Sequence, residues 1–232
     1  MVGMKNLEIL SIIIFGSSAR GENDAYSDLD VCVITLNTLN ASESNILKKH
    51  VSDKYNLSSE DITIYTSNQI ESMIEYGSLF LWHIKLEGKI LYDDGYFKET
   101  IIKLPRYDKH LSELYYHAEL IDDVAISLER FSMVNELDLS QIFTVCRNTC
   151  MILAHLNKEY AFGRNSAFLA ASRIYSDLPL TQHEYTDLSK WKLRYERGLY
   201  YDIKLPSLED MSTTIKRTRK LLYYAIEKVS NV

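Results

Sequence analysis

The chain has 232 residues, of which 46% are hydrophobic and 25% charged, with a formal net charge of −6. These values are typical of a soluble globular protein with one large or two small domains, and the acidic charge argues against a generic nucleic-acid coat. No apolar run approaches the roughly 18 residues that a membrane span needs, so we expect no membrane partner. Three cysteines without a C-x-x-C pair argue against a disulfide framework or a zinc knuckle, and they predict a cytoplasmic location.

The first hundred residues alternate between strand-like and helix-like segments. Their β-branched residues predict strands at Leu7–Phe15, Leu29–Leu36 and Glu60–Thr66. Apolar residues at helical spacing predict helices at Ser42–Tyr55, which opens on a serine, and at about Asn68–Tyr76. The pattern therefore indicates a domain that mixes strands and helices.

A further pair of short strands is expected within His83–Asp94, where Glu-Gly indicates a turn. The character of the sequence changes near Pro105, beyond which helical periodicity replaces the strand patterns. We therefore predict an α/β (α+β) domain over residues 1–104 and an all-α bundle of about five helices over residues 105–232.

The second half of the chain carries clear helix signals. Asn165 is expected to cap one helix, and capping-box spacing predicts two more helix starts, at Thr181 and Ser207. An apolar helix is expected over about Leu139–Leu156. The first helix of this half has an apolar face with steps of three and four residues, formed by Leu111, Leu114, Ala118, Ile121, Ala125 and Leu128.

The stretch FGSSARGENDAYSDLD, residues 15–30, begins with a candidate phosphate site. A strand that ends at Gly16-Ser17 and turns into a short helix would point free backbone N–H groups at phosphate oxygens. Gly16 would allow close approach of the backbone, and the Ser17 hydroxyl can donate a hydrogen bond. Arg20 lies about one helical turn further on, where its guanidinium could reach a phosphate.

The same stretch ends with two acidic residues that are suited to a metal. Asp28 and Asp30 are two residues apart at the head of an expected strand, so their carboxylates point to one face. Mg²⁺ would relieve their repulsion and bridge them to substrate phosphates. Asp61 would supply a third carboxylate if its strand lies beside Leu29–Leu36, whereas the adjacent Glu60 should point to the opposite face.

Each of these features also has a purely structural explanation. A Gly-Ser pair is an ordinary turn, an Asp-x-Asp pair is a common solvated strand end, and a single aspartate often starts a strand. Their joint occurrence in this order favours a phosphate cradle beside a carboxylate pair. That combination suits metal-assisted nucleotidyl transfer, in which one ion activates the attacking hydroxyl and two ions stabilise the developing charge.

The segment GSSARGENDAYSDLDVCV resembles the nucleotidyltransferase superfamily, which includes DNA polymerase beta, the kanamycin and streptomycin nucleotidyltransferases and the minimal nucleotidyltransferases. The resemblance is specific over about Ile12–Val33, looser to Asp94 and weak beyond. It implies a mixed, strongly twisted sheet with helices. The family pattern of Gly-Ser, Arg-Gly, Ser-Asp-x-Asp and a later acid is matched by Gly16, Ser17, Arg20, Gly21, Ser27, Asp28, Asp30 and Asp61.

The resemblance also implies roles for these residues. Asp28 and Asp30 would bind two Mg²⁺ ions, and Asp61 would bind the catalytic one. The nucleoside triphosphate would be held by Gly16, Ser17, Arg20 and Ser27. The implied reaction moves a nucleoside monophosphate, with AMP from ATP favoured, onto a hydroxyl and releases pyrophosphate.

The acceptor stays open between an antibiotic, a protein and an RNA, and a homodimer is compatible with the sequence. The helical half of related enzymes commonly helps to bind nucleotide and acceptor. It often supplies a carboxylate base, for which the first long helix offers Glu113, Glu119, Asp122, Asp123 and Glu129. The sequence does not choose among these five.

Other classes of function are compatible with parts of the chain. The second half could also resemble a HEPN domain, but the spacings of Arg147 from His155 and of Arg106 from His110 both depart from the ribonuclease motif of that family. The acidic first domain argues against a processive polymerase. The competing hypothesis is a non-catalytic module that binds a nucleotide or a partner, such as an antitoxin-like component of a toxin–antitoxin or phage-defence system.

Overall fold

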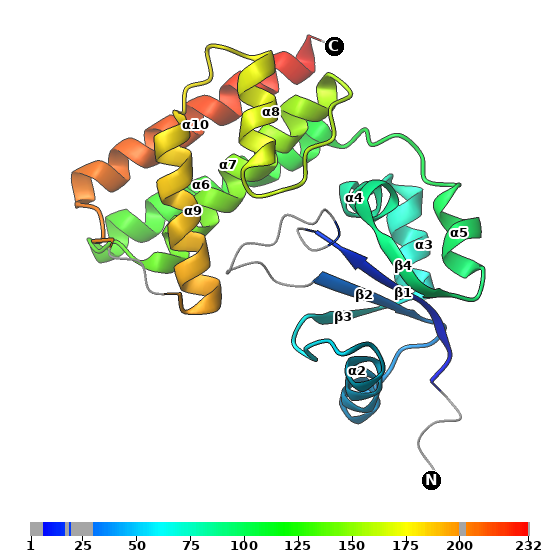
Figure 1. The fold of residues 1–232 in the computed structure, drawn as a ribbon. Coiled ribbons are helices and arrows are strands. Elements are labelled where there is room, and N and C mark those ends of the chain that lie inside the picture. The colour runs from blue at the N-terminus through cyan, green and yellow to red at the C-terminus, as the bar shows by residue number, and fades with distance from the viewer. Residues whose placement is uncertain (1–6, 17–18, 20–29, 200–202, 232) are drawn as a thin grey trace. The chain divides into compact units, whose positions relative to one another are not determined.

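The computed structural model describes residues 7–16, 19, 30–199 and 203–231 (Figure 1). The chain divides into two compact units, Met1–Asp108 and Lys109–Val232. Four residues predicted for the site, Ser17, Arg20, Ser27 and Asp28, lie outside the described residues. Each unit is therefore considered by itself.

The first unit is built on a mixed four-stranded sheet. The strands lie in the order β3-β2-β1-β4, with β1 antiparallel to β2 and β4, and β2 parallel to β3. This arrangement confirms the predicted α/β class. The strands are β1 (Ile9–Phe15), β2 (Asp30–Thr35), β3 (Ile62–Thr66) and β4 (Lys89–Asp93), and the helices are α2 (Ala41–Tyr55), α3 (Ser67–Glu75), α4 (Leu79–Glu87) and α5 (Tyr96–Ile101).

Helices cover the two faces of this sheet separately. Side chains alternate along a strand, so neighbouring residues enter different cores. Cys32 and Ile34 of β2 pack with α3, α4 and α5, whereas Val31 and Val33 pack with α2. Figure 1 shows α2 on one side of the sheet and the other three helices on the opposite side. We refer to these as the α4 face and the α2 face.

The predicted pair of strands in His83–Asp94 is partly wrong. Helix α4 runs through His83 to Glu87, and only β4 is a strand. The Ser78 side chain caps α4, and Leu81 with Ile84 buries one helical face in the core. The chain changes from helix to strand at Gly88. A glycine suits this position because a Cβ there would meet the Ile84 carbonyl oxygen. The packing of α4 against the sheet therefore outweighs the local signal from which a strand was predicted here.

The helix starts follow the capping signals with two exceptions. The predicted capping boxes at Thr181 and Ser207 are both present. Helix α2 begins one residue before the expected serine, and its cap is Asn40, which forms a capping box with Glu43. Asn165 occupies the predicted cap position, but its side chain makes no capping hydrogen bond.

The second unit contains five helices among its described residues, as predicted, and no strand is assigned there. They pack around α7, which contacts each of the other four, into one hydrophobic cluster. None of the helices in the described ranges is long and apolar enough to cross a membrane. The helices are α6 (His110–Phe131), α7 (Glu136–Leu156), α8 (Ser166–Ile174), α9 (Gln182–Arg197) and α10 (Leu208–Ser230).

The buried side of α6 is displaced slightly from the predicted face. Leu114 and Ile121 are buried as expected, but His117 and Val124 complete the buried set. Ala118 and Leu128 pack against the core without full burial. The displacement brings a histidine into the core of the second unit.

All three cysteines are buried and free. Burial raises the pKa of Cys32 to about 12. It also raises the pKa of Cys146 to about 12, although a hydrogen bond with Thr218 opposes the shift. The thiols therefore stay protonated, and the three free cysteines agree with the argument against a disulfide framework.

Candidate functional site

Strand pairing places Asp30 and Asp61 at the same edge of the sheet. Val31 pairs with Ile62 in the parallel ladder between β2 and β3, and the Val31 N–H donates to the Asp61 carbonyl oxygen at 3.0 Å. Asp30 and Asp61 immediately precede these two paired residues on strands that are about 4.8 Å apart. The condition on which the Asp61 prediction depends, a strand beside β2, is therefore met.

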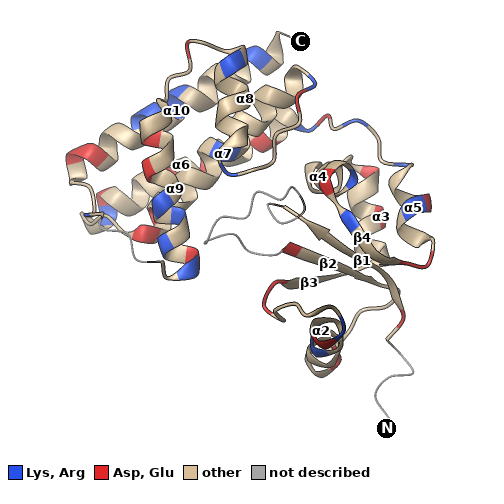
Figure 2. Ribbon diagram, in the orientation of Figure 1, with Lys and Arg blue, Asp and Glu red and all other residues tan. Residues whose placement is uncertain are grey.

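Asp30 lies on the α4 face of the sheet, because the next residue of β2, Val31, is buried against α2. Asp61 lies in the turn that leads into β3, next to the start of β2. Figure 2 shows acidic segments at the start of β2 and just before β3, at one edge of the sheet. Asp30 is exposed and Asp61 is half-buried, so a substrate can approach this edge.

Gly16 follows β1 directly beside this edge. Phe15 pairs with Asp30, and Gly16 has a φ of +76°, which L side chains rarely adopt. A Cβ built on Gly16 would overlap the Asp30 Oδ2 atom. The backbone can therefore pass close to the Asp30 carboxylate only because this residue is glycine, and the role of Gly16 in a phosphate cradle stays a prediction.

The described part of the site fits a hard metal ion. Asp30 and Asp61 lie at the neighbouring starts of β2 and β3, and carboxylate oxygens are the ligands that Mg²⁺ prefers. No group of three or more His, Cys, Asp or Glu side chains suited to a metal occurs within the described residues. The third predicted ligand, Asp28, lies outside them, so the donor set is incomplete without that residue.

An aromatic cluster lines the α4 face next to these aspartates. The Phe15 ring meets Phe80 and His83 edge-on, with ring centroids 5.5 Å and 5.4 Å apart. The Phe80 ring also packs against Tyr65 of β3, at 5.3 Å. Phe15 of β1, which pairs with Asp30, therefore also contacts the half-buried side of α4 that carries Phe80 and His83.

His83 and Glu87 form a hydrogen-bonded pair on this side of α4. The His83 Nε2 and Glu87 Oε2 atoms are 2.8 Å apart, and the side chains are 13% and 17% exposed. Sequence reasoning missed the pair because it expected strands within His83–Asp94. The i, i+4 spacing would have suggested it had a helix been expected.

The five α6 carboxylates considered as candidate bases stay unassigned. Four of them, Glu119, Asp122, Asp123 and Glu129, are exposed, and Glu113 is half-buried. Asp122 accepts a hydrogen bond from Arg219 of α10 at 2.6 Å. Nothing within the second unit distinguishes one of them as a base.

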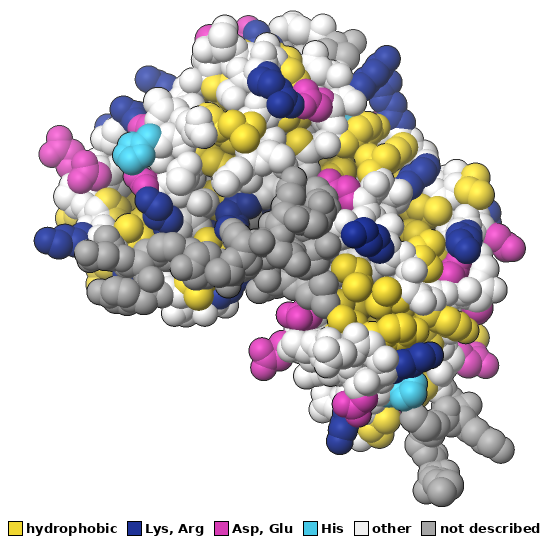
Figure 3. Space-filling model, viewed as in Figure 1, with side chains coloured by type: hydrophobic (Ala, Val, Ile, Leu, Met, Phe, Trp, Pro, Cys, Tyr) yellow, Lys and Arg dark blue, Asp and Glu magenta, His cyan; other side chains and the backbone are white. Residues whose placement is uncertain are grey.

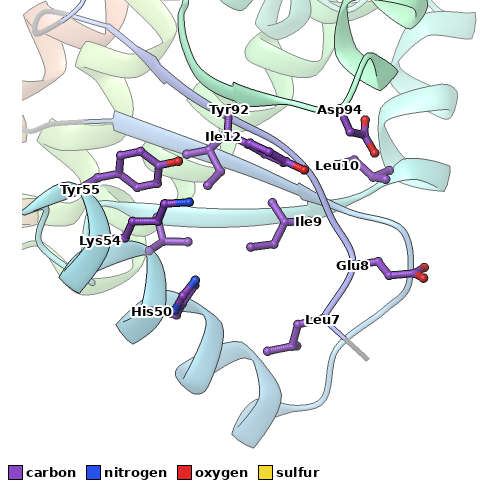
Figure 4. Close-up of a pocket in the computed structure, with 11 residues that line it drawn as sticks. Leu7, Glu8, Ile9, Leu10, Ile12, His50, Lys54, Tyr55, Tyr92 and Asp94 are labelled. Carbon is purple, nitrogen blue, oxygen red and sulfur yellow. The ribbon is translucent and has the colours of Figure 1, made fainter. Parts of the chain in front are cut away.

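A cavity with a volume of about 630 Å³ lies at the opposite end of β1 (Figure 4). Its walls come from the start of β1, the second half of α2 and the end of β4. The Lys54 ammonium group lies over the rings of Tyr55 and Tyr92, at 5.2 Å and 5.9 Å. Because Gly16, Asp30 and Asp61 do not line it, the geometry at the other strand end defines the candidate site.

Comparison with known proteins gives one family and several similar structures. Residues 2–95 match the family described as "Polymerase beta, Nucleotidyltransferase". No curated protein sequence matches the chain. The crystal structure of the spectinomycin adenyltransferase AAD(9) from Enterococcus faecialis with ATP and spectinomycin is similar, with a TM-score of 0.51 and 17% identity, over 96% of this chain and 94% of that chain.

Two toxin–antitoxin structures match a smaller part. One contains AMP-PNP, with a TM-score of 0.29 and 19% identity, over 53% of this chain and 90% of that chain. The other is a mutant of MntA–HpeT, with a TM-score of 0.29 and 16% identity, over 54% of this chain and 87% of that chain.

The matched segment contains Gly16, Asp30 and Asp61, which are the residues that the sheet brings together. The helical unit follows this segment, and the similar adenyltransferase extends over both units. Residues 2–95 of the chain therefore form a segment that matches the polymerase beta nucleotidyltransferase family, and a helical region follows this segment.

Proposed function

We propose that this protein is a Mg²⁺-dependent nucleotidyltransferase that transfers AMP from ATP to a hydroxyl group of a small molecule, with release of pyrophosphate. The observation that carries the proposal is the convergence of Asp30 and Asp61 beside Gly16 at one exposed edge of the sheet. We further propose a division into a nucleotidyltransferase domain, residues 1–104, and a helical domain, residues 105–232.

The residues of the site have separate tasks in this proposal. Asp28, Asp30 and Asp61 would hold two Mg²⁺ ions, which when bound neutralise charge on the reacting phosphates. Gly16 and Ser17 would offer backbone N–H groups to the triphosphate, because the backbone can approach closely at a glycine. Arg20 and Ser27 would add hydrogen bonds that orient the triphosphate.

The choice of donor and acceptor is supported by the similar adenyltransferase. That protein was solved with ATP and spectinomycin, and its fold is shared over nearly the whole of this chain. A fold shared over both units supports an acceptor of the same chemical kind, a polyhydroxylated small molecule. A protein or an RNA acceptor is a different outcome of the same experiment.

The test is label transfer from each α-labelled nucleoside triphosphate, with Mg²⁺, to a panel of hydroxylated antibiotics and to a bacterial lysate. We expect label from ATP on a small molecule and an equal amount of pyrophosphate. Label that is sensitive to protease or nuclease would show a protein or RNA acceptor. Nucleotide binding without pyrophosphate release would favour the non-catalytic module instead.

Matched variants make this test specific. Asp30→Asn and Asp61→Asn keep the side-chain shape but remove a charge, so we expect transfer to fall by at least about 10²-fold. Asp53→Asn makes the same change on the exposed side of α2, away from the site, and should leave transfer unchanged. Wild-type turnover in either site variant would refute the assignment of the carboxylates.

A further inference from the structure

The cavity at the start of β1 has dimensions and walls that suit a small ligand. Its volume of about 630 Å³ falls in the range of small-molecule sites, which is about 300–1,000 Å³. Most of its lining side chains are aliphatic or aromatic, with a few polar groups among them, as is usual for such sites. All of the lining residues belong to the first unit, and none of them has a role in the proposed transfer reaction.

Two irregularities in strand pairing border this cavity. The register of β1 against β2 shifts between Ile9 and Ser11, and the register of β1 against β4 shifts between Ile12 and Ile13. With regular alternation, residues 9 and 12 would point to opposite faces, yet both pack in the cluster on the α2 face. Bulges redirect side chains in this way and are frequent next to active sites. Here the irregular strand gives the cavity an apolar floor.

The wall that α2 contributes carries basic and aromatic side chains. His50 and Lys54 are four residues apart, so they lie on one helical face, and Tyr55 follows directly. Figure 4 shows these three side chains directed from α2 toward β1. The Lys54 ammonium group lies over the ring of Tyr55 and over the ring of Tyr92 on β4. The cavity thus combines an apolar floor with a cation that is flanked by aromatic rings.

No carboxylate neutralises Lys54 within the part of the chain that the structure describes. Its ammonium group forms no ion pair there and contacts the two rings instead. Glu8 and Asp94 also line the cavity, but their carboxylates lie on the side of β1 away from α2 (Figure 4). The Asp94 carboxylate accepts a hydrogen bond from the Tyr96 N–H at 2.9 Å. An anion that enters on the α2 side would therefore gain a charge-assisted contact with Lys54.

We propose that this cavity is a binding site for a small aromatic acid, a planar ring that carries a carboxylate. The ring packs on the floor formed by Ile9 and Ile12 and against the Tyr92 ring, since aromatic rings attract one another in offset or edge-on arrangements. The carboxylate accepts hydrogen bonds from the Lys54 ammonium group. This site is separate from Gly16, Asp30 and Asp61, so the inference does not rest on the proposed function.

The first test compares three probes that differ in one property each. Calorimetric titration of the full chain uses 2-naphthoate, the neutral 2-naphthalenemethanol, and decahydro-2-naphthoate, which keeps the charge but has no aromatic ring. We expect 2-naphthoate to bind about tenfold more tightly than either of the others, because it alone offers both a ring and a charge. Equal affinity for the neutral probe would overturn the role of charge, and equal affinity for the saturated acid would overturn the role of the ring.

Matched variants test whether the cavity itself holds the probe. Lys54→Met removes the ammonium group from an exposed side chain of similar length and should weaken 2-naphthoate binding by about tenfold, whereas Lys54→Arg should retain it. Tyr92→Leu should weaken binding by about 2–10-fold. Lys49→Met makes the same change on an exposed residue of α2 outside the cavity and should have no effect. Unchanged affinity in Lys54→Met, or an equal loss in Lys49→Met, overturns the assignment.

Methyl NMR locates the probe without any measurement of turnover. Addition of 2-naphthoate should shift the methyl signals of Ile12, on the cavity floor, and leave those of Ile142, in the core of the second unit, in place. Shifts at Ile142 without shifts at Ile12 would place the probe elsewhere and overturn the proposal.

The two proposals of function fail in different ways. Asp30→Asn should bind 2-naphthoate as the wild-type protein does, because Asp30 does not line the cavity. Normal binding of the acid without nucleotidyl transfer to any acceptor counts against the proposed function alone. Nucleotidyl transfer by a protein that does not bind the acid counts against the cavity site alone.

Discussion

The two units bury their hydrophobic side chains in different ways. The sheet of the first unit divides its interior into two clusters, one around Cys32 and Ile34 and one around Val31 and Val33. The second unit has one cluster around α7, into which all five of its helices pack. Figure 3 shows hydrophobic side chains on the surface as well, and on the first unit the exposed ones include Ile90 and Tyr92 of the edge strand β4.

This difference determines where polar groups lie. In the first unit strand register places acidic residues at an exposed sheet edge, where they can meet a substrate. Both units bury uncharged polar side chains, such as Ser11 in the first and Thr149 in the second, but the second also buries the titratable side chain of His117. The His117 Nδ1 and Thr149 Oγ1 atoms have no hydrogen-bond partner among the described residues. The buried histidine makes the stability of the second unit sensitive to pH.

The largest effect that tests this comparison comes from matched truncations in the two interiors. Ile13 and Ile142 are both fully buried, the first in the sheet and the second on α7. Replacing either with alanine should cost about 2–5 kcal/mol of unfolding free energy. Hydrogen exchange should show the loss of protection mainly in the unit that carries the change. Equal loss in both units for each variant would show that the two cores unfold as one.

A pH titration should separate the units further. Burial lowers the pKa of His117 from 6.5 to about 4, so the folded second unit binds fewer protons than the unfolded chain between these values. The contribution of neutral His117 to the unfolding free energy is fully present above pH 6.5. This contribution falls by about 3 kcal/mol in total as the pH drops to about 4. Urea unfolding of His117→Leu should lack this loss, whereas the exposed control His183→Gln should retain it.

The first unit should respond in a lower pH range. Burial raises the pKa of Asp93, but hydrogen bonds from Ser11 and from the N–H groups of Phe97 and Lys98 outweigh this and lower it below 3.8. Its contribution is therefore present above pH 3.8 and is lost below it. Loss of the first unit at the same pH as the second would contradict this separation.

The smallest effect concerns helix starts within the second unit. The Thr181 side chain accepts a hydrogen bond from the Glu184 N–H, so Thr181→Ala should cost about 1 kcal/mol of stability. Asn165→Ala occupies the equivalent position of α8, where no side-chain capping bond exists, and should be nearly neutral. Denaturant titration of both variants would detect the difference. Equal costs would mean that Asn165 caps its helix after all.

Much of the first unit could be predicted from the sequence because its strands are rich in β-branched residues. The expected strands agree with β1, β2 and β3, and the expected helices agree with α2 and α3. Helix α4 could not be recognised, since only nine residues with mixed polarity form it and the sheet beneath decides its conformation. Helix α5 has six residues and depends on hydrogen bonds to Asp93, which no periodicity reveals.

The candidate site likewise contains residues that could be predicted from the sequence and residues that could not. Asp28 and Asp30 could be named from their spacing, and Asp61 from its position at the head of a strand. Strand order is a tertiary property, so the proximity of Asp61 to Asp30 follows only from the pairing of β2 with β3. His83 and Glu87 escaped notice because their relation depends on a helix that local patterns do not indicate.

The close approach of Gly16 to Asp30 has a consequence for how this sequence can vary. Any side chain at position 16 needs the space that the Asp30 carboxylate occupies, so the two positions cannot change independently. A substitution that shortens Asp30 would relieve the overlap with a side chain at position 16 and would remove a charge of the proposed metal site. In variants selected for stability alone we expect both positions to change together, whereas variants selected for nucleotidyl transfer should keep both Gly16 and Asp30.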